Sequence, residues 1–232
     1  MYADQIDNEL RREIFLRLCK NEVLPYSKLK PAGVESNQFA YHLKKLKDDG
    51  FIEKLEGGYR LAPKGLRLAD YLSFKTELVR LQPKMVAIFM VFSEDGRQVL
   101  ASKRLKQPQI NKLVFPSGKL HFGETLEASV QRMSVELFGG LNLKFNKVGS
   151  AWLKFSKNKI CYSHLFSEIF VAKVSSAERL RLEDFSDTGT GHRLFWQNVE
   201  LKFSDGWAEG SREIFEAVQS GKKFELDLEY NG

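Results

Sequence analysis

The chain has 232 residues, of which 43% are hydrophobic and 28% charged, so it is long enough for two folded domains of ordinary composition. Its longest apolar run, 85–92, is far shorter than the roughly 20 residues that span a bilayer, and its first residues lack a signal-peptide pattern. Cys19 and Cys161 stand alone, which argues against a disulfide framework and a zinc site. We therefore expect a cytoplasmic protein with no membrane partner.

The formal net charge of +6 is unevenly distributed. Residues 1–84 hold 16 Lys and Arg against 12 Asp and Glu, whereas the longer remainder holds 20 against 18. An excess of positive charge in the smaller part suits a polyanionic partner. The surplus is modest, so it becomes informative only together with local motifs.

Three short helices are expected in the first part of the chain. Apolar residues recur at helical spacing over 6–20, and a second helix is expected over 25–30, before the turn-forming residues 31–33. A third helix is expected over 36–46, with Ser36 capping its start.

The third helix has two different faces. Phe39, Leu43 and Leu46 recur at helical spacing and form a core face. Amide and ammonium side chains can pair with base edges in the major groove, and a merely solvated helix face would carry the same groups. The opposite face of this helix is polar and consists of Asn37, Gln38, Tyr41, His42, Lys44 and Lys45.

Two short strands, 51–56 and 59–62, are expected to pair across Gly57-Gly58 as a hairpin. The string YHLKKLKDDGFIEKLEGGYRLAPKG strongly resembles winged-helix regulators of the ArsR and MarR type, over about the first 75 residues. The resemblance implies a winged helix-turn-helix that binds double-stranded DNA, with the third helix in the major groove and Lys54 and Arg60 on phosphates. Winged helices also serve as protein docking modules.

The expected domain boundary lies at Pro83. Residues 64–82 are expected to continue as a connector helix with leucines around it, which makes it a candidate seam for a homodimer. We therefore expect a winged helix-turn-helix with its connector over 1–82, an α/β domain over 84–221 and a C-terminal tail over 222–232.

The second domain shows the pattern of a mixed α and β fold. A hairpin is expected first, because two apolar runs flank a turn signal. The expected elements are strands over 85–92 and 98–102 around the turn 93–96, strands over 161–174 and 193–197, and a closing helix over 209–220.

The sharpest motif lies in residues 115–140. Its spacing is that of the Nudix box: G, five residues, E, seven residues, then R-E-U-x-E-E-x-G-U, where U is aliphatic. The segment therefore resembles Nudix (MutT-like) domains, over roughly residues 85–220. The resemblance implies an α/β/α sandwich with a mixed sheet, so we expect an α+β fold class, and it implies hydrolysis of nucleoside diphosphates with Mg²⁺ or Mn²⁺. The residues at the required spacings, which the resemblance places at the ligand site, are Gly118, Glu124, Arg132, Glu136 and Gly139.

Departures from the box weaken the expectation of catalysis. The family has glutamates where this chain has Met133 and Leu137, and aliphatic residues where it has Ser134 and Gly140. Positions 133, 136 and 137 share one helical face, and Mg²⁺ takes oxygen ligands, which Met and Leu do not supply. Glu136 is therefore the single candidate for catalysis and for metal binding, and no cofactor is certain.

The other side chains of the motif are expected to pack or to hold the loop. Met133 and Leu137 continue an apolar stripe with Leu126 and Val130, which predicts a packing surface. Arg132 is expected to pair with a carboxylate, and Glu124 is expected to support the junction of loop and helix.

Residues outside the motif are weaker candidates. The polar stretch 178–192 is expected to be a loop, from which Glu183, Asp184 or Asp187 could lend a further carboxylate. His121 could face a ligand or lie on the surface. The remaining candidates are Trp152 and Phe155, which could stack on a base or pack in the core.

Three functions remain open. The first is a homodimeric transcription regulator in which the winged helix reads DNA and a catalytically impaired Nudix-like domain senses a nucleotide-type ligand. Known Nudix-related regulators pair these two domains, often in the reverse order, and some respond to ADP-ribose-type metabolites related to NAD. The second is a Nudix hydrolase that cleaves a nucleoside diphosphate linked to another group. The third is an interaction module with neither activity.

Overall fold

The protein, seen in a computed structural model, consists of two compact units, 1–81 and 82–232. None of the helices in the described part of the chain is long and apolar enough to cross a membrane. The described residues are 6–73, 78–79, 81–105, 107–141, 143–184, 192–200, 203 and 206–231.

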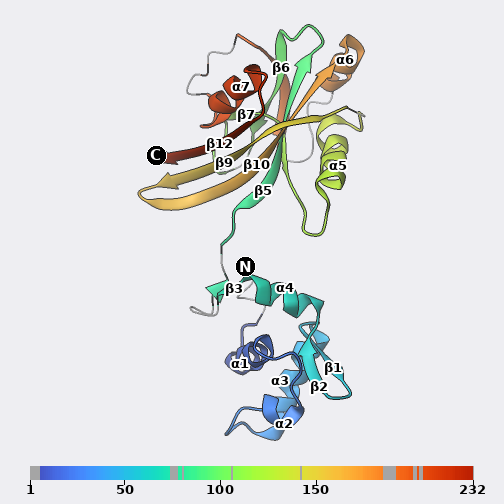
Figure 1. The fold of residues 1–232 in the computed structure, drawn as a ribbon, viewed down its shortest axis with the longest axis vertical. Helices are drawn as coiled ribbons and strands as arrows, with labels where there is room; N and C mark the ends of the chain where they lie inside the picture. Colours follow the sequence, from blue (N-terminus) through green and yellow to red (C-terminus); the bar gives the residue numbers. More distant parts are fainter. Residues whose placement is uncertain are drawn as a thin grey trace. The chain divides into compact units, whose positions relative to one another are not determined.

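The first unit contains three helices followed by a two-stranded hairpin, as the sequence predicts (Figure 1). A fourth helix and a short strand pair complete it. The elements are α1 (Glu9–Cys19), α2 (Tyr26–Leu29), α3 (Ser36–Asp48), β1 (Ile52–Leu55), β2 (Gly58–Leu61), α4 (Pro63–Tyr71), β3 (Leu72–Ser73) and β4 (Leu78–Val79).

The core of the first unit forms where apolar side chains recur at helical spacing. The side chain of Asn8 accepts a hydrogen bond from the backbone N–H of Arg11 and so caps α1. Each large apolar side chain that is fully buried contributes about 1.5–3 kcal/mol, so this cluster holds the helices together. Its fully or almost fully buried members include Ile14, Phe15, Leu18, Phe39, Leu43, Leu46 and Phe51.

Two local expectations for this unit are wrong. Glu35 is the residue before α3, and the hydroxyl of Ser36 accepts a hydrogen bond from Lys30 Nζ (2.9 Å) instead of capping the helix. The hairpin turns one residue earlier than expected, because Leu55 pairs with Gly58. A Cβ atom at Gly58 would lie 2.3 Å from the carbonyl oxygen of Leu24, so this glycine is required by a close backbone approach.

The expected connector helix is also corrected. Helix α4 ends at Tyr71, and Leu72 is extended (φ −80°, ψ 134°). Leu72 pairs with Val79. Backbone N–H and C=O groups that would form hydrogen bonds within a longer helix are therefore paired between β3 and β4.

The second unit is built on one mixed sheet with the strand order β11-β6-β5-β10-β9-β12, in which β7 also pairs with β6 and β8 with β5. The pairs β5/β10 and β9/β12 are parallel, and the other pairs are antiparallel. The elements are β5 (Lys84–Ser93), β6 (Gln98–Arg104), β7 (Leu113–Val114), β8 (Ser117–Lys119), α5 (Leu126–Phe138), β9 (Asn146–Lys157), β10 (Ile160–Val174), α6 (Ser176–Asp184), β11 (His192–Asn198), α7 (Ser211–Gln219) and β12 (Phe224–Asn231).

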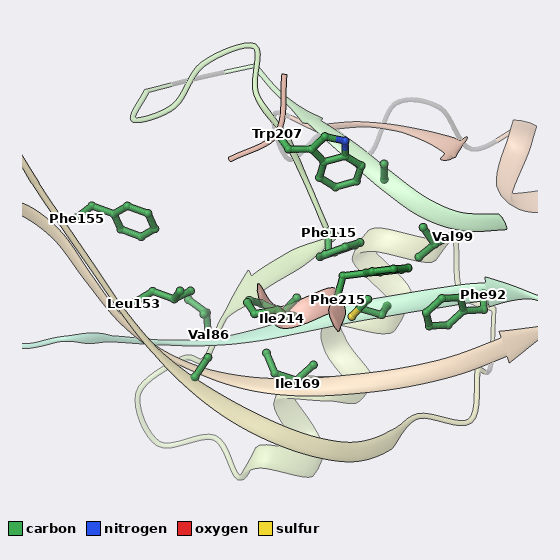
Figure 2. Packing of buried hydrophobic residues seen from close by; sticks show 14 residues of the cluster. Val86, Phe92, Val99, Phe115, Leu153, Phe155, Ile169, Trp207, Ile214 and Phe215 are labelled. Carbon is green, nitrogen blue, oxygen red and sulfur yellow. The ribbon is translucent and has the colours of Figure 1, made fainter. Parts of the chain in front are cut away.

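Helices cover both faces of this sheet. Helices α5 and α6 lie on one side and α7 on the other (Figure 1). The central strand β5 alternates between the two cores, with Ile88 and Met90 on the α7 side and Phe89 and Val91 on the α5 side. Figure 2 shows the α7-side core, in which Phe115 and Phe215 lie close together (stacked, with ring centroids 6.4 Å apart).

The strands and the closing helix predicted from the sequence are confirmed, whereas two regions differ from expectation. The stretch expected to be a polar loop begins as helix α6, and residues 185–191 lie outside the described residues. The expected tail at 222–232 contains β12, which pairs in parallel with β9 over 224–231. The apolar side chains of β12 are half-buried and alternate with exposed polar ones, so burial of one face holds the strand in the sheet.

Candidate functional site

The loop before α5 is fixed to the helix by one carboxylate. Arg132 donates to both oxygens of Glu124 (Nε to Oε1 and Nη2 to Oε2, each 2.8 Å). The hydroxyl of Ser129 (2.7 Å) and the backbone N–H of His121 (3.2 Å) also donate to Oε2. The hydrogen bonds from Arg132 and Ser129 lower the pKa of Glu124 to about 2. The expected pairing of Arg132 is therefore present, and it holds the junction of loop and helix.

The two ends of α5 are defined by local chemistry. The hydroxyl of Thr125 accepts the backbone N–H of Ala128, and Gly139 ends the helix in the left-handed conformation (φ 63°). This frame places residues 132–137 beside Gly118 and the end of β8, because Arg132 Nη2 also donates to the carbonyl of Lys119 (3.0 Å).

The face of α5 that would hold a metal in the Nudix family is a packed apolar surface. Met133 is 0% exposed and Leu137 is 3% exposed. A Cβ atom at Gly118 would lie 2.3 Å from Met133 Sδ, so the glycine leaves the room that the methionine fills. Leu126 and Val130 pack against the same cluster, as the apolar stripe predicts.

The residues present do not fit a family-type metal centre. Glu136 is the remaining carboxylate on the face of α5 that the resemblance assigns to metal, and Arg132 Nη1 donates to it (3.1 Å). Nowhere in the described ranges do three His, Cys, Asp or Glu side chains gather as metal ligands would. Hard divalent cations need several oxygen ligands, and this face presents one carboxylate beside sulfur and carbon.

A cleft of about 470 Å³ opens beside this face in the second unit. Its walls come from strands β5 to β10, from α5 and from the start of α7. One part is apolar and includes Val86, Leu153, Phe155 and Leu165. The charged residues of the lining are Lys84, Arg104, Lys119, Arg132, Glu136 and Glu209.

Some of the weaker candidates from the sequence line the cleft, and others do not. Phe155 lines the cleft and is 5% exposed, whereas Trp152 packs on Phe166 with ring centroids 4.8 Å apart. His121 lines the cleft with an exposed ring. The side chains of Glu183 and Asp184, at the end of α6, and the whole of Asp187 lie outside the described residues.

Sequence reasoning missed four charged residues of the cleft: Lys84, Arg104, Lys119 and Glu209. They come from the start of β5, the end of β6, the end of β8 and the residues before α7. No short spacing links these positions, so the sequence contains no motif that would have found them.

In the first unit, most of the predicted DNA-facing residues are exposed. They are Asn37, Gln38, Tyr41, Lys44 and Lys45 on α3, and Lys54 and Arg60 on the hairpin.

His42 is the exception, because it is half-buried and its Nδ1 atom is shielded from solvent. Partial removal from water, and then the nearby Arg11, lower the pKa of His42. His42 is therefore less exposed than the other predicted residues of α3, which packs against α1.

Three of the predicted DNA-facing side chains form ion pairs in the protein. Lys45 pairs with Asp49 (3.0 Å), and Lys44 lies 3.5 Å from Asp48. Arg60 pairs with Glu53 across the hairpin. Exposed ion pairs of this kind are weak and screened by salt, so a phosphate can replace the carboxylate.

Residues 4–72 match a domain family of unknown function (DUF7347), and no curated protein matches. Among solved structures, a mutator MutT protein from Bacillus halodurans is similar at 19% identity, over 64% of this chain and 90% of that one, with a TM-score of 0.47.

Two structures of NrtR from Shewanella oneidensis are also similar. Its Nudix domain, in complex with ADP ribose, shares 12% identity over 67% of this chain and 97% of that one (TM-score 0.46). The protein in complex with a 27mer DNA shares 15% identity over 59% of this chain and 61% of that one (TM-score 0.47).

Proposed function

We propose that the protein is a DNA-binding transcription regulator whose second unit is a Nudix-like domain that binds a nucleotide-type ligand without efficient hydrolysis. The observation that carries the proposal is the exposed polar face of α3 in a unit of three helices and a hairpin. This order of elements is that of a winged helix-turn-helix, in which the third helix enters the major groove.

The DNA-binding role follows from the side chains on that face. Asn37 and Gln38 lie in the first turn of α3, where a recognition helix contacts base edges. Their amides can donate and accept hydrogen bonds at once, as base edges require. Lys54 and Arg60 on the hairpin supply phosphate contacts, which position the unit without reading sequence.

The sensing role rests on the second unit. The cleft has the size of a small-molecule site and combines an apolar wall with charged groups. The junction of Glu124 and Arg132 keeps the motif's loop in place, whereas Met133 and Leu137 fill the face that would collect metal ions. Binding without efficient turnover is the function that fits both observations.

We test DNA binding with the full chain by selection from random duplexes, followed by titration at several salt concentrations. Lys44→Ala and Arg60→Ala should weaken binding to all sequences and reduce the salt slope by about one contact each. Gln38→Ala should relax sequence preference. Lys20→Ala, an exposed lysine outside α3 and the hairpin, is the matched control. No affinity for any duplex at about 50 mM salt would exclude the regulator.

A homodimer forms part of the proposal, because winged-helix regulators usually address two half-sites one helical turn apart. Leu66 of α4 is 57% exposed and gives a second copy an apolar surface to cover. Light scattering should give twice the chain mass, and Leu66→Glu should shift it to the monomer. A monomeric wild-type chain at high micromolar concentration would contradict this.

A hydrolase is the second candidate, because Glu136 and Glu209 both line the cleft. Wild-type protein with Mg²⁺ or Mn²⁺ should convert ADP-ribose, NADH and nucleoside triphosphates at near background rates. Robust turnover that Glu136→Gln abolishes would establish the hydrolase instead. A chain that binds neither DNA nor these nucleotides would be an interaction module.

A further inference from the structure

We propose that the cleft of the second unit holds a phosphate or diphosphate group directly on Lys84, Arg104 and Lys119, with no divalent cation between them. The inference rests on the proposed nucleotide-type ligand and specifies how its phosphates are bound. It follows from four features of the cleft: the convergence of three cations, their lack of carboxylate partners, the packed face nearby and an apolar wall in the same cleft.

The three cations converge because of strand pairing. Lys119 in β8 pairs with Val86 in β5, and both residues line the cleft. Lys84 lies two residues before Val86, so the pleat places its side chain on the same face of β5. Arg104 ends β6, and its Nε atom donates to the carbonyl of Pro108 (2.9 Å), which orients the guanidinium plane. A guanidinium fixed in this way can still present two N–H groups to a phosphate.

These cations differ from the lysines of α3 in lacking carboxylate partners. Within the described part of the chain, no ion pair involves Lys84, Arg104 or Lys119, whereas Lys44 and Lys45 each have an aspartate. The two carboxylates of the cleft do not change this, because Glu136 pairs with Arg132 and, among the described residues, no ion pair joins Glu209 to the three cations.

In the free protein, Lys84, Arg104 and Lys119 repel one another. Partial burial, and then repulsion by Lys119 and Arg104, lower the pKa of Lys84. Burial also lowers the pKa of Arg104. A group of like charges held together without a counterion is destabilised, and a bound anion would remove that repulsion.

The nearby helix face explains why the site would work without metal. In Nudix proteins divalent cations neutralise the phosphates, but here Met133 and Leu137 supply no oxygen ligands where the family has glutamates. Cationic side chains then have to supply the neutralising charge. A phosphate monoester has a charge of about −1.5 to −2 at pH 7, which three cations can balance.

The remainder of the ligand would lie on the apolar wall. Leu153 and Phe155 of this wall come from β9, and Figure 2 shows them at some distance from the ring pair of Phe115 and Phe215. Leu153, Phe155 and Phe115 all line the cleft. A nucleoside or sugar on this wall would add affinity by burying apolar surface, so a nucleotide should bind more tightly than its phosphate alone.

The test is calorimetric titration of the full chain with ADP-ribose and with inorganic pyrophosphate, both in EDTA. We expect binding in EDTA, no tightening on addition of Mg²⁺, and higher affinity for ADP-ribose. Lys84→Met, Arg104→Gln and Lys119→Ala should each weaken both ligands at least tenfold. Lys173→Ala changes an exposed lysine of β10 that does not line the cleft, and it should leave both affinities unchanged.

Thermal unfolding separates a lost site from a damaged fold. Because the folded state disfavours the charged form of Lys84, Lys84→Met should unfold at the same or a higher temperature while it loses affinity. Wild-type binding of ADP-ribose that the three substitutions leave intact would refute the cationic site but keep the nucleotide ligand. Binding that requires Mg²⁺ would likewise refute it. No binding of either probe would overturn both this inference and the proposed ligand class, whatever the DNA titration gives.

Discussion

Replacing Met133 with glutamate would restore one carboxylate that the Nudix resemblance places on the metal face. The structure predicts that it destabilises the second unit, because the methionine is fully buried with its sulfur against Gly118. Losing the buried Met side chain removes about 1.5–3 kcal/mol. Burying an unpaired carboxylate costs several kcal/mol more unless it becomes protonated. We expect the free energy of unfolding to fall by about 3–5 kcal/mol, which is a large share of the stability of a typical domain.

Urea unfolding followed by tryptophan fluorescence measures this change in the second unit alone. All three tryptophans, Trp152, Trp196 and Trp207, belong to that unit. With a typical urea slope of about 2 kcal/mol per molar, a loss of 4 kcal/mol lowers the midpoint by about 2 M.

Two control substitutions separate burial from chemistry. Val135 lies on the same helix but is 58% exposed, so Val135→Glu adds the same carboxylate to solvent and should change stability by less than about 0.5 kcal/mol. Met133→Leu keeps the volume and should cost less than about 1.5 kcal/mol.

Two results would refute the reasoning that this face is packed. One is equal stability of Met133→Glu and Val135→Glu. The other is recovery of the lost stability with Mg²⁺, since a cation at ten times its dissociation constant adds about 1.4 kcal/mol. Either outcome would mean that the face opens readily and can still collect a metal.

Three further predictions concern the junction, the hairpin and the last strand. Since the pKa of Glu124 lies at about 2 instead of 4.5, its contribution to stability is present above pH 4.5 and lost as pH falls toward 2. The difference in melting temperature between wild type and Glu124→Gln should therefore narrow from pH 7 to pH 3, and a constant difference would contradict the pairing with Arg132. Gly58→Ala should destabilise the first unit by more than about 1 kcal/mol, because the alanine Cβ would meet the carbonyl oxygen of Leu24. Circular-dichroism melts should show this loss, while the tryptophan transition of the second unit stays unchanged. Ending the chain at Gly221 removes β12 and exposes the edge of β9. The urea midpoint followed by tryptophan fluorescence should then fall, or the protein should aggregate through that edge. An unaltered midpoint would show that the strand is dispensable.

The sequence alone determined the features that depend on neighbours along one helix. The spacing of Phe39, Leu43 and Leu46 predicts the core face of α3, and all three are buried. The same periodicity places Met133 and Leu137 on an apolar stripe, and both are buried. Residues three and four apart on a helix are adjacent in any fold, so such a pattern needs no tertiary information.

Tertiary structure decided the features that depend on distant parts of the chain. Residues 224–231 alternate apolar and polar side chains, but only the long-range parallel pairing with β9 makes them a strand. His42 belongs to the polar face of α3 by sequence, and the packing of α1 half-buries it.

The cleft is the clearest case of this dependence. Lys84, Arg104 and Lys119 stand on three strands, and they meet because β8 pairs with the start of β5 while β6 ends beside them. Helical or strand periodicity relates only residues within one element, so it gives no sign that these three charges share a site. The register of the sheet brings them together, and that register is fixed by burial of both faces of β5.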